Sequence, residues 1–103
     1  MKAAILHAPN QMKLETTADP VAQPGDLVLR VRAATICGTD IRVFRGRKTA
    51  GIRYPSIIGH EFSGEIVMTH GPSLFQVGQR VGVCPAIPCG HCAPGEPSSS
   101  RER

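Results

Sequence analysis

Tryptophan is absent from this chain, and aromatic residues make up only 4% of its 103 residues. Aliphatic side chains must therefore fill whatever core the chain forms. The sequence has no secretory signal segment and no apolar run long enough to span a membrane. Its four cysteines do not form a convincing disulfide framework. These absences predict a cytoplasmic protein without a membrane partner.

A dinucleotide-binding fingerprint is also missing. No G-x-G-x-x-G motif follows an expected strand, so the sequence predicts no Rossmann domain and no NAD(P) site within this chain. The length allows one small domain, which would bury only ~60–65% of the surface of its unfolded chain. Such a domain is expected to be marginally stable.

The formal net charge of +4 is modest, but the basic residues are locally dense after residue 41. The dense stretch contains Arg42, Arg45, Arg47, Lys48 and Arg53. It offers only two aromatic side chains on which bases could stack, so nucleic-acid binding is not expected. Two interpretations stay open: a solvated loop, which is the commoner outcome, and attraction of an anionic substrate or a phosphate-bearing partner.

Alternation of apolar and polar residues predicts a mainly β fold. It is clearest in residues 26–34, where every second residue is apolar, as expected of a half-buried strand. The apolar residues that share this face are Leu27, Leu29, Val31 and Ala33. The other expected strands are residues 1–7, 11–17 and 63–70.

A short helix is expected over residues 39–46. Thr39 or Asp40 is its expected cap. Ile41, Phe44 and Val43 are expected to face inward.

The stretch from Cys37 to Glu61 carries the candidate metal ligands. A thiolate and a neutral imidazole are favoured zinc ligands, so Cys37 and His60 supply two, and Glu61 is the candidate third. Asp40 is the candidate partner for the second imidazole nitrogen, and Thr39 places a hydroxyl where it could pass a proton. Spacing alone leaves a second interpretation open, a core thiol and a satisfied histidine, because C-x22-H is not a local zinc signature.

His60 and Glu61 are adjacent, which constrains this proposal. Neighbouring residues of a regular strand point to opposite faces, so both can face one ion only if the backbone bends. Gly59 and Gly64 flank the pair and permit such a bend.

Four separated motifs occur in this order along the chain: Pro24-Gly25-Asp26, Cys37-Gly38-Thr39-Asp40, Gly59-His60-Glu61-Phe62 with Gly64, and Val77-Gly78-Gln79-Arg80-Val81. Together they resemble the zinc-containing medium-chain alcohol and polyol (sorbitol-like) dehydrogenases. The resemblance covers residues 1–92, less than a third of a typical member, which has a GroES-like catalytic domain and a Rossmann domain. It implies a partial GroES-like domain at residues 1–92, folded as a curved antiparallel β-barrel with one short helix.

The resemblance also implies a reaction and a ligand set. The parent enzyme would oxidise an alcohol or polyol with zinc and NAD(P). Thr39 and Asp40 would belong to its catalytic machinery. His60 is then a ligand, and Glu61 is a direct ligand in the polyol enzymes, whereas a later cysteine completes the site in the alcohol enzymes. Only the ligand set of the polyol enzymes, which here is Cys37, His60 and Glu61, is complete within this chain.

The chain alone is expected to be inactive, because NAD(P) would bind only in the full-length parent, an expected homo-oligomer. The open side of the barrel would face the absent nucleotide domain, so aggregation of the isolated chain is expected. Two alternatives stay open: a zinc-binding module without catalysis, and an interaction-only barrel without metal.

The end of the chain departs from the family pattern. Cys89 and Cys92 resemble the opening of the family's structural zinc lobe, but the next two ligand positions fall on Gly95 and Arg103, which cannot serve. A closed structural site needs four ligands, so this site is expected to be incomplete. The other possible ligands nearby are Cys84 and His91.

Residues 93–103 are polar, rich in serine and proline, and expected to be disordered. The abrupt change suggests a truncation, a frameshift or a natural short form.

Overall fold

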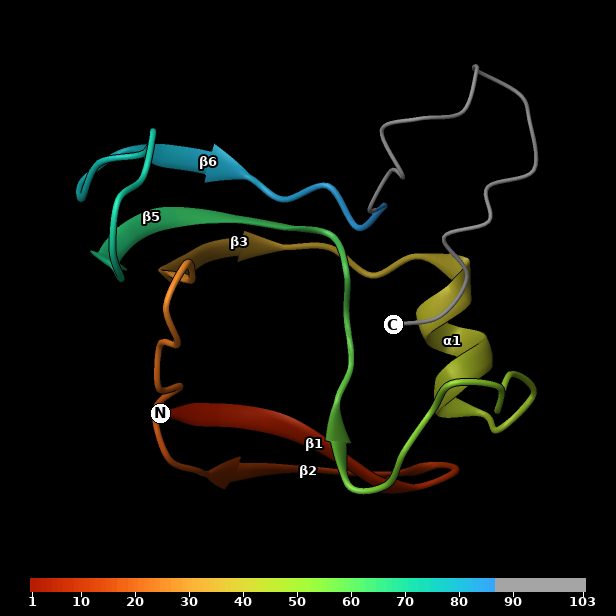
Figure 1. The fold of residues 1–103 in the computed structure, drawn as a ribbon. Helices are drawn as coiled ribbons and strands as arrows, with labels where there is room; N and C mark the ends of the chain where they lie inside the picture. Colours follow the sequence, from red (N-terminus) through yellow and green to blue (C-terminus); the bar gives the residue numbers. More distant parts are fainter. Residues whose placement is uncertain (87–103) are drawn as a thin grey trace.

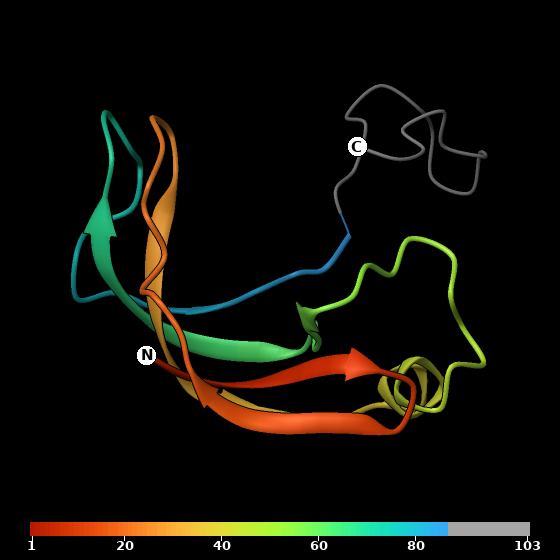
Figure 2. The same cartoon turned by 90° about the horizontal axis from the view of Figure 1, so that it is seen from below.

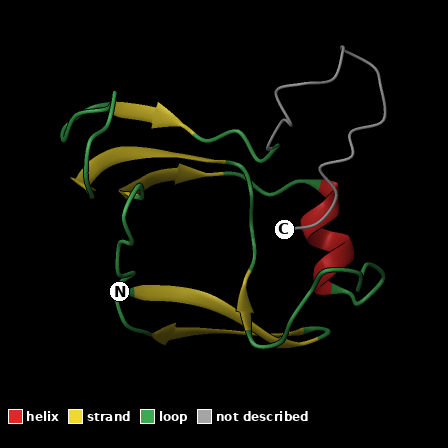
Figure 3. Ribbon diagram, in the orientation of Figure 1, coloured by secondary structure: helices red, strands yellow, loops and turns green. Residues whose placement is uncertain are grey.

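The computed structural model describes residues 1–86, which fold into two three-stranded sheets and one short helix (Figures 1 and 3). The predicted mainly β fold is confirmed. The expected disordered tail and the end of the expected domain at residue 92 lie outside the described residues. The elements are β1 (Lys2–Ala8), β2 (Gln11–Thr16), β3 (Leu27–Ala34), α1 (Gly38–Phe44), β4 (Ser56–Ile57), β5 (Phe62–Thr69) and β6 (Arg80–Gly82).

The first sheet has the order β2-β1-β4. β1 and β2 form an antiparallel hairpin, closed by a turn in which Asn10 has a φ of 60°. Asparagine tolerates this left-handed conformation better than most residues. Leu6 of β1 is fully buried, and Ala3 of the same strand is also buried, at 8% exposure.

The second sheet has the order β3-β5-β6, and all of its pairs are antiparallel. Gly64 of β5 lies opposite Val31 of β3. A Cβ at this position would lie 2.5 Å from the carbonyl oxygen of Arg30, so the close approach of the two strands requires glycine here. Two register shifts between β3 and β5 accompany the strong curvature of the pair (Figure 2).

The expected barrel is not closed within residues 1–86. Closure requires hydrogen-bonded strands around the whole circumference, whereas here the two sheets remain separate. β4 has only two residues and pairs only with β1. The buried apolar core of the described residues is correspondingly small: Ala3, Leu6, Val43 and Ile66.

The helix α1 begins one residue before the expected start, with Cys37 as its N-cap residue. Val43 is buried and Phe44 is half-buried, as expected. The expectation that Ile41 faces inward is wrong: this side chain is 46% exposed and borders a large apolar pocket. No helix within residues 1–86 is long and apolar enough to cross a membrane.

Candidate metal centre

The candidate ligands lie on two segments that the second sheet holds side by side. Cys37 lies three residues after the end of β3, whereas His60 and Glu61 lie immediately before β5. Because β3 and β5 are antiparallel and Ala34 pairs with Phe62, the chain after β3 runs alongside the chain before β5. The Thr35 amide donates to the Glu61 carbonyl oxygen at 2.9 Å and extends this pairing by one step.

The backbone bends just before the His-Glu pair. Residues 58–61 lie outside the strands, and Gly59 has a φ of 114°, a conformation that side chains with a Cβ rarely adopt. The bend lets His60 and Glu61 point toward the same region, which a regular strand would not allow. The structure thus has the bend that the adjacent ligands require.

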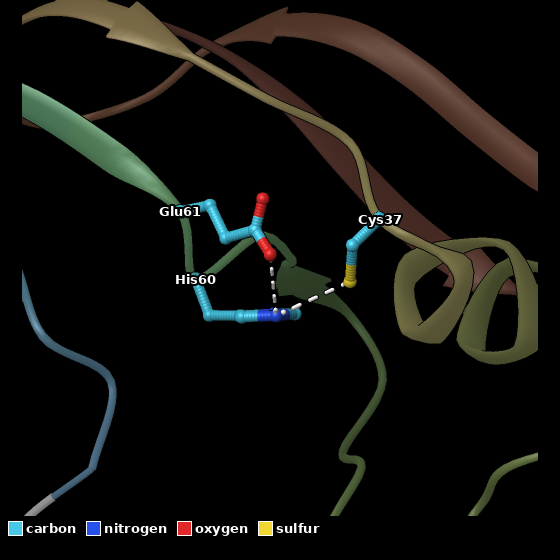
Figure 4. A group of neighbouring side chains, drawn as sticks. All are labelled: Cys37, His60 and Glu61. Carbon is cyan, nitrogen blue, oxygen red and sulfur yellow. Dashed lines mark hydrogen bonds and ion pairs between the residues drawn. The ribbon is translucent and has the colours of Figure 1, made fainter.

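The bend brings the three candidate ligand atoms together (Figure 4). His60 Nε2 lies 3.3 Å from Cys37 Sγ and 3.8 Å from Glu61 Oε1. One donor atom from each of the three residues lies within 4.8 Å of the other two. Tetrahedral bonds of about 2.0–2.3 Å to zinc place ligand atoms about 3.3–3.8 Å apart, so the spacing suits this metal.

Asp40 lies behind the imidazole and connects two of the candidate ligands. Its Oδ1 lies 3.4 Å from His60 Nδ1, while its Oδ2 accepts a hydrogen bond from the Cys37 amide at 3.0 Å. Asp40 is only 7% exposed. One buried carboxylate therefore orients the imidazole, leaving Nε2 free toward Cys37, and also fixes the start of α1.

Thr35 is a site residue that the sequence reasoning missed. Its hydroxyl donates to Glu61 Oε2 at 2.5 Å, which leaves Oε1 directed toward His60. Hydrogen-bonded partners that orient a ligating carboxylate are common at metal sites. The two residues are 26 positions apart, so no local sequence pattern could have linked them. They meet because β3, which precedes Thr35, pairs with β5, which follows Glu61.

The donor set supports zinc on chemical grounds. A thiolate sulfur, an imidazole nitrogen and a carboxylate oxygen are the three donor types that zinc takes from proteins, and three protein ligands are typical of a catalytic site. The His60 side chain is 35% exposed and that of Glu61 is 45% exposed. A metal held here would therefore keep an accessible side for a small molecule.

Three pockets are lined by His60, and two of them also reach the helix α1. The larger, about 610 Å³, is walled mostly by apolar residues of β1, β3 and α1, and it also includes Glu61. The smaller, about 390 Å³, includes Thr39. Within residues 1–86, no hydrogen bond joins the Thr39 hydroxyl to the candidate ligands, so its proton-relay role stays a prediction.

The expected incomplete structural zinc site cannot be placed. Cys89, Cys92 and His91 lie outside the described residues. Cys84 is exposed, and its thiol donates to the Ala86 carbonyl oxygen at 3.7 Å.

Comparison with known proteins gives a consistent result. Residues 23–101 match the alcohol dehydrogenase GroES-like domain. The starvation-sensing protein RspB of Escherichia coli K12 is 38% identical over 95 residues, covering 91% of this chain and 28% of RspB. Sorbitol dehydrogenase of Bacillus subtilis is 36% identical over 96 residues, covering 89% of this chain and 27% of that enzyme.

Solved structures agree with the sequence matches. An E. coli CFT073 RspB structure, described as an alcohol dehydrogenase complexed with NADH, superposes with a TM-score of 0.78 at 37% identity, over 91% of this chain and 27% of that one. For 2R,3R-butanediol dehydrogenase from B. subtilis the TM-score is 0.71 at 30% identity, over 79% of this chain and 26% of that one. This chain thus spans just over a quarter of the length of the curated relatives it matches. The family match covers most of the chain, which therefore belongs to the alcohol dehydrogenase family, within its GroES-like domain.

Proposed function

We propose that this chain forms the zinc-binding part of the catalytic domain of a dehydrogenase that oxidises an alcohol or polyol with NAD(P). The observation that carries the proposal is the meeting of Cys37, His60 and Glu61 donor atoms within 4.8 Å of one another. Family membership supports the class of reaction, and relatives named as sorbitol and D-altritol dehydrogenases support a polyol substrate.

The ligand set proposed is that of the polyol enzymes. Glu61 Oε1 is directed toward His60, and Thr35 holds the other carboxylate oxygen. This arrangement favours Glu61 as a direct ligand over a role near the metal. Zinc bound by these residues would act as a Lewis acid toward the substrate hydroxyl.

The chain's own residues then have distinct tasks. Asp40 orients His60 and ties it to Cys37. Thr39, on the wall of the smaller pocket, is proposed to pass the substrate proton toward solvent. Hydride transfer needs a nicotinamide held beside the substrate carbon. The sequence has no dinucleotide fingerprint, so we expect this chain alone not to complete the reaction.

Native mass spectrometry of the purified chain, equilibrated with zinc, tests the metal site. We expect one zinc ion per chain and its loss in Cys37→Ser. Serine is a good N-cap residue, so this variant removes the thiolate while preserving the start of α1. The matched control is Cys84→Ser, which replaces an exposed thiol that does not belong to the group of three candidate ligands and should keep the ion.

Two results would contradict the proposal. Absence of specific zinc binding by the folded chain would remove the metal site. Equal zinc binding by wild type and Cys37→Ser would show that the ion lies elsewhere. Separately, alcohol-dependent reduction of NAD(P) in proportion to the concentration of purified chain would overturn the expected inactivity.

A further inference from the structure

The segment between the two halves of the metal centre is unusually basic. Residues 38–59 contain five of the chain's 12 lysine and arginine residues and a single acidic residue, Asp40. The ion pairs formed within residues 1–86 involve none of these five basic side chains. They carry positive charge that the described part of the protein does not neutralise by direct pairing.

Two of these side chains line the smaller pocket beside the metal centre. Lys48 and Arg53 come from the loop of residues 45–55, which leaves α1 and returns to β4 (Figure 2). His60 also lines the same pocket, as do the hydroxyl-bearing residues Thr39 and Ser56. Its volume of about 390 Å³ falls within the range of small-molecule sites, roughly 300–1,000 Å³.

Basic side chains line the smaller pocket but not the larger one. The larger pocket of about 610 Å³ has no lysine or arginine in its lining. Glu61 borders the larger pocket but is not among the residues that line the smaller one. The only carboxylate lining the smaller pocket is Asp40, which is 7% exposed and already contacts His60 Nδ1 and the Cys37 amide.

From these observations we infer that the substrate is an anionic polyhydroxy compound rather than a neutral alcohol. Lys48 and Arg53 bind its carboxylate or phosphate group, while Thr39 and Ser56 face its hydroxyl groups and one hydroxyl reaches the metal beside His60. Carboxylate and phosphate share the chemistry that these cations recognise. This inference rests on the proposed dehydrogenase function and narrows its substrate class.

Binding to the full-length chain of this sequence tests the inference without requiring turnover. The zinc-loaded, 15N-labelled chain is titrated with three probes that share a six-carbon polyol skeleton: sorbitol, gluconate and sorbitol 6-phosphate. Amide shifts in the loop of residues 45–55 and in α1 report the site and the dissociation constant. Gluconate and the phosphate ester separate the two possible anionic groups.

We expect at least one anion to bind more tightly than sorbitol by about fivefold for each cation that contacts it, with the difference falling at high salt. Lys48→Gln and Arg53→Gln should each remove about that factor for the anion and leave sorbitol binding unchanged. The matched control is Lys13→Gln, on the exposed face of the hairpin, which should change neither.

The outcomes are separable. If zinc binds but neither anion exceeds sorbitol, the inference is wrong and the proposed function stands. If Lys13→Gln weakens anion binding as much as the pocket variants do, the attraction comes from net charge and the inference is also wrong. If zinc itself does not bind, the proposed function fails, and the inference fails with it.

Discussion

Replacement of Asp40 probes the link between the fold and the metal centre. The carboxylate lies 3.4 Å from His60 Nδ1 and accepts a hydrogen bond from the Cys37 amide at 3.0 Å, so it acts on two candidate ligands at once. Loss of a group that orients a metal ligand typically lowers metal affinity about 10- to 100-fold. We expect Asp40→Ala to fall at the upper end of this range, because both contacts disappear.

Asp40→Asn separates the two contacts. The amide keeps an oxygen that can accept from the Cys37 N–H, but it lacks the negative charge facing the imidazole. We therefore expect Asp40→Asn to lower zinc affinity by about tenfold while the stability of the metal-free fold changes little. Asp40→Ala should also destabilise that fold by about 0.5–2 kcal/mol through the altered start of α1.

Competition with a chromophoric zinc chelator at one fixed pH measures the affinity, and urea unfolding of the metal-free chain measures stability. Asp26 provides the matched control, because its Oδ2 also accepts a hydrogen bond from the backbone amide three residues earlier, that of Gln23, at 2.8 Å. Asp26→Ala should alter stability without altering zinc affinity. A zinc affinity of Asp40→Ala within about twofold of wild type would refute the orienting role.

Two further substitutions test the surroundings of the site. Gly64→Ala should destabilise the fold by about 1–3 kcal/mol, because its Cβ would lie 2.5 Å from the Arg30 carbonyl oxygen. The control is Gly82→Ala, because nothing lies within 4 Å of a Cβ at that position. Equal urea midpoints for the two variants would contradict the packing argument. Thr35→Val keeps the shape of the side chain but removes the hydroxyl that donates to Glu61 Oε2. We expect it to weaken zinc binding by about tenfold. An unchanged zinc affinity in the chelator assay would mean that the position of Glu61 does not depend on this hydrogen bond.

The sequence predicted the two long strands of the second sheet well, because their apolar spacing follows the period of two, but it gave no prediction of the three-residue strand β6. The expected strands at 26–34 and 63–70 correspond to β3 and β5 within one residue at each end. The burial of β3 was predicted less well. Leu27 and Leu29 are half-buried, but Val31 is 54% exposed because it borders the large apolar pocket. Alternation identifies the apolar face without telling how much of it is covered.

The candidate ligands were recognisable because they lie in local motifs, whereas their supports depend on distant pairing. Cys37 and the His60-Glu61 pair each have glycine beside them, and their donor chemistry is specific. The contact between Thr35 and Glu61 depends instead on the β3–β5 register, which two irregularities displace. Local composition cannot specify such a register, so this hydrogen bond emerged only from the structure.

The position of the ligands along the chain links metal binding to folding. Cys37 and His60 are 23 residues apart, and α1 and the loop of residues 45–55 lie between them. Bringing the ends of such a segment together costs about 3 kcal/mol of chain entropy. The buried apolar core of the described residues comprises only four side chains, so a metal that joins the two ends would contribute to folding as well as to chemistry. Lys48 and Arg53 lie on this same closed segment. The pocket inferred to bind the anion is therefore expected to be best ordered when the metal is bound, which couples the two sites through the loop itself.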